Sequence, residues 1–166
     1  LSSHLLKEPK EMALRKATST DETDLLMIVN ETDGTIAAYS LFTQQQVVAP
    51  SELTTDGEFI EVAVDVTDIY VVTKRVFDGT TKYFVELFDS DYFTDCAFSG
   101  GAVSSVSSLP HEGADLKVIA DGNILADETV SSGSITFDRA STSSYEVGLP
   151  FSVEVKTMPV DKDVGT

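Results

Sequence analysis

The sequence is poor in cysteine, tryptophan and basic residues. Cys96 is the only cysteine among 166 residues, so no disulfide can form within the chain, and a cysteine-based metal site would need other ligand types. We expect its thiol to be buried and inert. With 11 Lys and Arg against 28 Asp and Glu, the net charge of −17 repels nucleic-acid phosphates and anionic lipid. We therefore expect no specific nucleic-acid binding and no membrane partner.

Long hydrophobic runs are also missing. The chain contains no run of about 18 apolar residues, the length that a membrane-spanning helix needs. The first residues, LSSHLLKEPKEM, carry charges where a signal peptide needs a continuous apolar segment, which predicts a soluble chain without a targeting signal. The chain begins at Leu1 and not at Met, which predicts a piece of a longer protein. Its 42% hydrophobic content is nevertheless that of a globular protein with a buried core.

Short apolar runs separated by Gly and Pro predict an all-β fold. Asp-Gly and Ser-Gly pairs stand between several of these runs and supply the positive backbone angles of tight hairpins. The one helix candidate, 5–16, is weak because Pro9 interrupts it. The expected strands are 25–29, 35–42, 46–49, 59–64, 69–77, 82–88, 116–120, 123–125, 134–137 and 151–157.

The segment FIEVAVD at 59–65 shows the alternation of a half-buried antiparallel strand. This alternation predicts two opposite faces. One face carries Phe59, Glu61, Ala63 and Asp65, and the other carries Ile60, Val62 and Val64.

A change of composition near 89–102 divides the chain into two predicted domains. Residues 1–92 are expected to form an antiparallel meander resembling a β-propeller blade, which would need neighbours because a lone blade has two open faces. Residues 93–166 are rich in Ser, Gly and Val and are expected to form a small β-barrel or sandwich. Within this part, 99–105 (SGGAVSS) is expected to be a flexible hinge and 159–166 a linker.

Residues 109–127, LPHEGADLKVIADGNILAD, hold the histidine and carboxylates that most resemble a catalytic group. His111 and Glu112 could act as a general base and its carboxylate partner, but such a pair needs a nearby nucleophile and a third, orienting group. The chain has no G-x-S-x-G nucleophile motif. We favour a turn, in which Leu109 enters the core and His111 caps exposed backbone groups. No catalytic residue is predicted.

Other candidate sites are equally weak. The acidic residues near the N-terminus offer the oxygen ligands that Ca²⁺ prefers but do not fit the twelve-residue EF-hand loop, so a solvated loop is the default. The glycines at 99–105 match neither a phosphate loop nor a dinucleotide motif. No metal or cofactor is therefore predicted. The acidic residues are Asp21, Glu22, Asp24, Glu31 and Asp33.

A group of aromatic residues could form a platform that stacks sugars or bases, but at strand spacing a place in the core is favoured. The group comprises Tyr70, Phe77, Tyr83, Phe84, Phe88, Tyr92 and Phe93.

Three stretches together resemble a phage family. They contain LLMIVNETDGTIAAYSLFTQQQVVAPSELTTDGEF, FDGTTKYFVELFDSDYFTDC, and LPHEGADLKVIADG closed by VGLPFSVEVKTMPV. These stretches resemble the C-terminal part of a virion structural protein of short-tailed phages, of the tail tubular protein B or tail nozzle type. The first part is similar to a propeller-like region of that family, and the last to an all-β module likened to the FCCH domain of ubiquitin-activating enzymes.

This resemblance implies a non-enzymatic part of a phage tail. The full-length protein would form a homo-oligomeric, hexameric ring through which the genome would pass. This ring would contact other tail proteins. It would be assembled in the host cytoplasm and reside in the virion. The charge of −17 could then line a lumen that repels DNA and lets it slide. No catalytic residues come with the family.

Two other functions compete with this interpretation. A carbohydrate- or host-receptor-binding module would show exposed aromatic residues near Asp or Asn, and the lack of Trp counts against it. A tail glycosidase would use a pair of carboxylates, but the acidic residues are too evenly spread for a pair to stand out.

In the structural interpretation, the segment 109–127 forms a turn, a strand, an Asp-Gly hairpin and a further strand. Leu116, Val118 and Ile124 are then expected to pack inward. We predict that His111→Ala leaves assembly intact, whereas a β-branched residue in place of Gly122 damages folding by forcing an unfavourable backbone angle.

Overall fold

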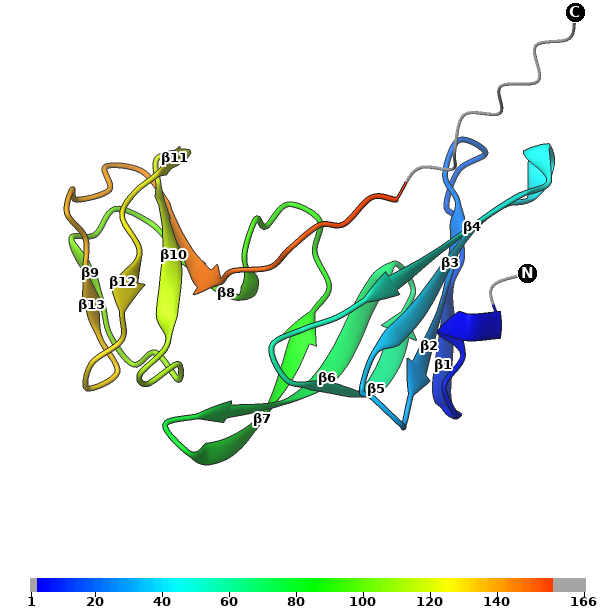
Figure 1. Ribbon diagram of the computed structural model, residues 1–166. Coiled ribbons are helices and arrows are strands. Elements are labelled where there is room, and N and C mark those ends of the chain that lie inside the picture. Colours follow the sequence, from blue (N-terminus) through cyan, green and yellow to red (C-terminus); the bar gives the residue numbers. More distant parts are fainter. Residues whose placement is uncertain (1–2, 157–166) are drawn as a thin grey trace, which may run out of the picture.

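The computed structural model describes residues 3–156, and it is all-β with antiparallel sheets, which confirms the predicted fold class. Strands β1 to β7 form one lobe and strands β8 to β14 the other (Figure 1). The strands are β1 (Pro9–Arg15), β2 (Asp24–Asn30), β3 (Ile36–Phe42), β4 (Val47–Leu53), β5 (Glu58–Asp65), β6 (Asp68–Phe77), β7 (Thr80–Leu87), β8 (Asp95–Gly100), β9 (Ser105–Val106), β10 (Asp115–Ala120), β11 (Asn123–Ile124), β12 (Glu128–Thr129), β13 (Ile135–Thr136) and β14 (Tyr145–Leu149). Two short 3₁₀ helices, η1 (Ser3–Leu5) and η2 (Thr43–Gln45), accompany them.

The first lobe consists of two sheets that share one core. The expected meander is divided between a four-stranded sheet, β1-β2-β3-β4, and a three-stranded sheet, β5-β6-β7. The backbone N–H of Phe59 in β5 donates to the carbonyl of Gly34 in the β2–β3 turn at 2.8 Å, which ties the two sheets together. The shared core contains Met27, Val29, Ile36, Ala38, Phe59, Val62, Ile69 and Val71.

The second lobe also encloses a single core. The sheet β11-β10-β14-β8 and the pair β13-β9 supply the apolar side chains, so two small sheets face one interior. No closed barrel forms among residues 3–156. Leu109, Leu116 and Val118 are buried as predicted, whereas Ile124 is 79% exposed and its predicted inward packing is wrong.

The β6–β7 hairpin reaches both cores. Strand β6 has ten residues and is therefore about 33 Å long. Its side chains at odd positions are buried, with Val71 in the core of the first lobe and Phe77 in the core of the second. At the tip, Asp78 and Gly79 both have positive φ, as the predicted Asp-Gly hairpin requires. A single hairpin thus connects the two lobes by packing.

Some sequence predictions fail for local reasons. The helix candidate 5–16 is instead η1 followed by strand β1, because pairing with β2 outweighs the helix-forming composition of PKEMALR. The alternation predicted for 59–65 breaks at a β-bulge, where the register shifts between Phe59 and Glu61. The bulge places Phe59 and Val62 together in the core.

The remaining differences lie after residue 92. Strands β8, β9, β12 and β14 were not expected, and Gly100 belongs to β8 and lies against the Tyr145 ring, so it is no free hinge. Residues 151–156 are exposed and form no strand, unlike the expectation for 151–157. The proposed linker 159–166 lies outside the described residues.

Candidate functional site

His111 lies in the core between the two lobes and not in an exposed turn. Its side chain is fully buried, with edge-to-face contacts to Phe77 at 5.2 Å and Phe98 at 5.4 Å between ring centroids. Its Nε2 lies 3.1 Å from the carbonyl oxygen of Cys96. Because a carbonyl only accepts, Nε2 carries the proton and Nδ1, which has no hydrogen-bond partner, is unprotonated.

This environment keeps His111 neutral. Burial lowers the pKa of its imidazole, and the positive charges of Arg75 and Lys82 lower it further. The Cys96 carbonyl that it binds belongs to a residue with φ of 49°, beside the register shift between β8 and β14. His111 is a buried structural residue, and the expectation that it caps exposed backbone groups is wrong.

Glu112 does not pair with His111. Its carboxylate accepts hydrogen bonds from the backbone N–H groups of Ser132 at 2.9 Å and Gly133 at 2.6 Å. A carboxylate bound in this way stabilises the adjacent turn. The structure therefore separates the two residues that the sequence placed side by side, and it assembles no base and carboxylate pair from them.

Two of the N-terminal acidic residues, Asp24 and Asp33, form ion pairs with lysines. Asp24 accepts from the Ala17 N–H at 2.8 Å and pairs with Lys16, while Asp33 lies 2.6 Å from the Lys7 ammonium. These contacts lower the pKa of both carboxyl groups, with the lysine hydrogen bonds as the largest cause. Within residues 3–156 no group of three or more His, Cys, Asp or Glu is placed to hold a metal ion.

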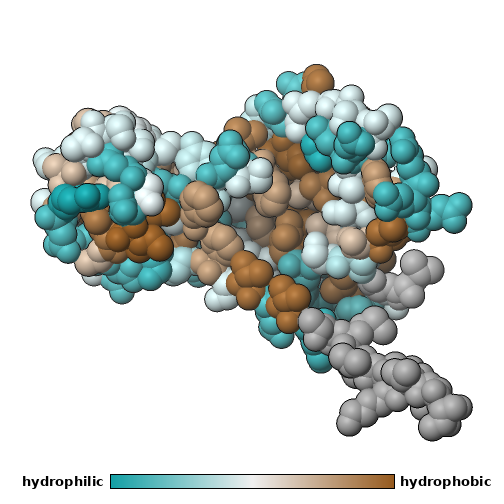
Figure 2. All heavy atoms as spheres, turned by 90° about the horizontal axis from the view of Figure 1, so that it is seen from above, coloured by the Kyte–Doolittle hydropathy of each residue, from teal (hydrophilic) through white to brown (hydrophobic). Residues whose placement is uncertain are grey.

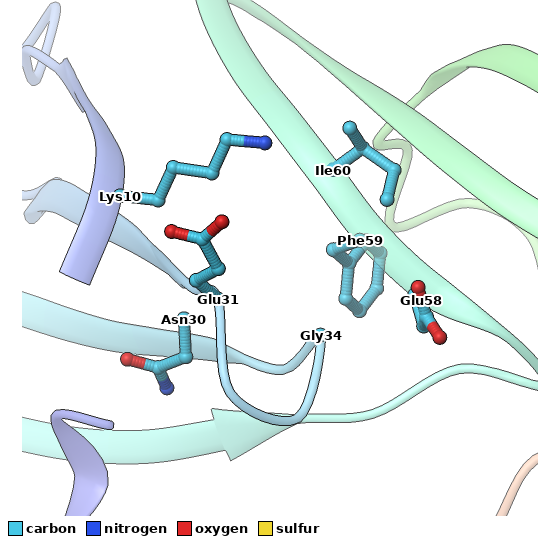
Figure 3. A pocket seen from close by; sticks show the side chains of 7 residues that line it. All are labelled: Lys10, Asn30, Glu31, Gly34, Glu58, Phe59 and Ile60. Carbon is cyan, nitrogen blue, oxygen red and sulfur yellow. The ribbon is translucent and has the colours of Figure 1, made fainter. Parts of the chain in front are cut away.

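A surface hollow of about 190 Å³ lies between β1, the β2–β3 turn and β5 (Figure 3). Lys10 and Glu31 extend into it opposite Phe59 and Ile60. The Asn30 amide points away, since it donates to the Leu5 carbonyl at 2.8 Å. The polar part of its lining consists of the Lys10 amine, the carboxylates of Glu31 and Glu58, and Asn30.

The junction of the lobes is built around Arg75 on β6. Its guanidinium is 1% exposed, and all five N–H donors find acceptors. Two bonds go to Glu86 on β7 at 3.1 Å each, two to Asp95 on β8 at 2.9 and 3.0 Å, and one to the Asp56 carbonyl at 3.0 Å. Because Asp95 begins the second lobe, this bidentate pairing joins the lobes in a defined geometry.

Cys96 follows Asp95 and lies beside this network. Burial, together with the smaller effect of the Glu86 charge, raises the pKa of the Cys96 thiol to about 12. The thiol is therefore protonated at neutral pH and unreactive. The expectation of a buried cysteine is confirmed.

The opposite face of the same hairpin is apolar and exposed. Tyr83 is 65% exposed and Val85 is 76% exposed, and cross-strand pairing places Val85 beside Val72. We call this surface the outer apolar face. It comprises Tyr70, Val72, Val76, Tyr83, Val85 and Leu87.

This surface corrects the aromatic prediction. Of the seven aromatic residues expected in the core, Phe77 is buried and Phe84 packs against the same core. The other five are exposed: Tyr70, Tyr83, Phe88, Tyr92 and Phe93. Alternation along a strand cannot reveal this, because it separates the two faces without saying which one is covered.

A second apolar feature is the segment that follows β14. Phe151, Val153 and Val155 alternate with Ser152, Glu154 and Lys156, and all six residues are exposed. Apolar atoms gather between the lobes and along the chain that leads to the grey residues (Figure 2). Among the described residues, no strand pairs with this segment or with the outer edge of β7.

No known protein family matches the chain, and no curated protein matches its sequence. No helix within residues 3–156 has the length and apolar character needed to span a membrane.

Proposed function

We propose that this chain is a non-enzymatic structural subunit of a phage tail, part of a nozzle-like ring that assembles with its own copies and with other tail proteins. The resemblance of the sequence to tail nozzle proteins suggests the virion. The observation that carries the assembly role is the outer apolar face. An apolar, solvent-facing sheet surface on a soluble chain marks a protein–protein contact, since its burial releases about 25 cal/mol per Å².

The charge distribution is compatible with this role. A net charge of −17 opposes association of copies through long-range repulsion, so a surface of low net charge favours contact. Within the outer apolar face, Lys74 lies opposite Tyr83 and pairs with Glu58, and Glu61 lies opposite Val72 on the β5 side. In the proposed ring, the acidic remainder of the surface would face the genome and repel it.

The mass of the chain in solution, measured by light scattering across concentration and salt, tests the assembly role. We expect association that strengthens between about 0.05 and 0.5 M salt as repulsion is screened. Val85→Glu on the outer apolar face should weaken it about tenfold, roughly 1.4 kcal/mol. The matched control is Val48→Glu on β4, which adds the same charge at a half-exposed valine of the other sheet and should leave association unchanged.

A chain that stays monomeric at every concentration and salt, or association that Val85→Glu leaves intact, would contradict this role. The same measurement on the longer protein that this proposal implies tests the ring. If that protein is no larger than its monomer, the ring is refuted, and a ring-sized mass would support it.

Exposed tyrosines favour the alternative of a carbohydrate-binding module, because Tyr70 and Tyr83 offer ring surface on the outer apolar face. Glycan binding that Tyr83→Ala abolishes and Val85→Glu spares would support that alternative. If Val85→Glu loses self-association and the wild-type chain binds no glycan, the assembly role is supported.

A further inference from the structure

We propose that residues 151–156 of one copy add as an antiparallel strand to the free edge of β7 in a second copy. This inference rests on the proposed assembly role and specifies how the contact is made. Strand addition satisfies the unpaired backbone groups of an edge strand and places alternate side chains in register.

The segment has the sequence of a strand without the pairing of one. Phe151, Val153 and Val155 occur at every second position, with Val153 77% and Val155 80% exposed. Six extended residues span about 20 Å, which fits within the roughly 26 Å of the eight-residue strand β7. An exposed β-pattern that pairs with no strand within residues 3–156 points to a partner sheet in another molecule.

The edge of β7 offers the complementary surface. Tyr83, Val85 and Leu87 also alternate, and they stand on the exposed side of the sheet. Addition of the segment would extend the outer apolar face by one strand and cover the edge. β7 also lacks the proline that Pro50 supplies to the edge strand β4, a common device against such pairing.

Charge selects one register of the pair. If Val153 stands opposite Tyr83, then Glu154 stands opposite Lys82 and Phe151 opposite Val85. Lys156 then faces Thr80, so no like charges meet.

Two other registers place Val153 opposite a β7 residue of the outer apolar face, and both bring like charges together. With Val153 opposite Val85, Lys156 faces Lys82. With Val153 opposite Leu87, Glu154 faces Glu86. Directly opposed like charges destabilise an antiparallel pair, which favours the register with Tyr83.

Disulfide trapping between two differently tagged chains tests this pairing. One chain carries Tyr83→Cys and the other Val153→Cys, and the mixture is oxidised mildly. Cys96 remains in place because its thiol is buried. We expect a mixed disulfide between the two chains in at least tenfold excess over the pair of Val48→Cys and Val153→Cys, whose valine on β4 is also exposed. Equal trapping in both mixtures, or trapping only within a single chain, would overturn the inference.

Charge substitutions separate this inference from the assembly role itself. Val153→Glu with Val155→Glu should weaken association at least tenfold, as Val85→Glu does, and both positions are exposed, so the fold should tolerate the change. If Val85→Glu blocks association and the double variant does not, the assembly role stands and strand addition fails. If neither affects association, both fail.

Discussion

The inner face of the β6–β7 hairpin buries charge, whereas its outer face exposes apolar side chains. Inside, Arg75 and Glu86 meet Asp95 from the second lobe, and outside, Tyr83 and Val85 face solvent. Both departures from the usual distribution have one explanation. The inner face is already a contact between two parts of the chain, and the outer face has the composition of a contact whose other half is another molecule.

Removing the charge of Arg75 should give the largest difference in stability between substitutions on the inner and on the outer face of the hairpin. Arg75→Met leaves the carboxylates of Glu86 and Asp95 close together without their cation, and we expect the free energy of unfolding to fall by about 3 kcal/mol or more. Urea denaturation measures this loss. The control is Lys74→Met, the next residue on the outer side, whose exposed ion pair with Glu58 is worth about 0–1 kcal/mol.

Equal losses for the two variants would show that the inner network contributes no more than a surface ion pair. Adding Asp95→Asn to Arg75→Met sharpens the result. It removes one of the two uncompensated charges and should recover part of the lost stability.

The sequence predicts the hairpins better than it predicts what covers them. Asp-Gly pairs and β-branched alternation are local signals, so the turn at 78–79 and strands such as β6 follow from them. The sequence also contains a local signal for the junction between the lobes. Val71, Thr73, Arg75 and Phe77 occupy one face of β6, and a lone arginine among buried positions of a strand implies buried acidic partners.

Those partners could not have been identified from the sequence alone. Glu86 and Asp95 lie 11 and 20 residues away from Arg75, among 28 acidic residues of similar appearance. The burial of His111 depends likewise on how Phe77 and Phe98 from two other strands meet. Long-range packing of this kind leaves no periodic pattern along the chain.

The buried histidine should give the inner face a pH dependence that the outer face lacks. The folded pKa of His111 is lowered, so below the unfolded value of about 6.5 the unfolded chain binds a proton that the folded chain excludes. Stability should therefore fall as pH drops from about 6.5 to 5.5, by up to about 1.4 kcal/mol per pH unit. His111→Ala should lower stability for a separate reason, because it leaves a cavity and removes the hydrogen-bond partner of the Cys96 carbonyl.

Chemical denaturation of the wild type and of His111→Gln at several pH values checks this. Glutamine can still donate to the Cys96 carbonyl but does not titrate in this range. The variant should be less stable at pH 7 and should show a flatter profile between pH 6.5 and 5.5. Identical slopes would mean that His111 does not exclude the proton.

The smallest effect on folding is expected at the centre of the outer apolar face. Val85→Thr keeps the shape and the β-branch of the side chain and changes only its polarity. Since Val85 is 76% exposed, we expect a change in the free energy of unfolding of at most about 0.5 kcal/mol. Val71→Thr, on the inner face of the neighbouring strand, buries the same hydroxyl and should cost about 1–3 kcal/mol. Urea denaturation of dilute monomer measures both costs. If Val85→Thr and Val71→Thr cost the same, the outer apolar face stabilises the single chain and is not a free binding surface for a partner.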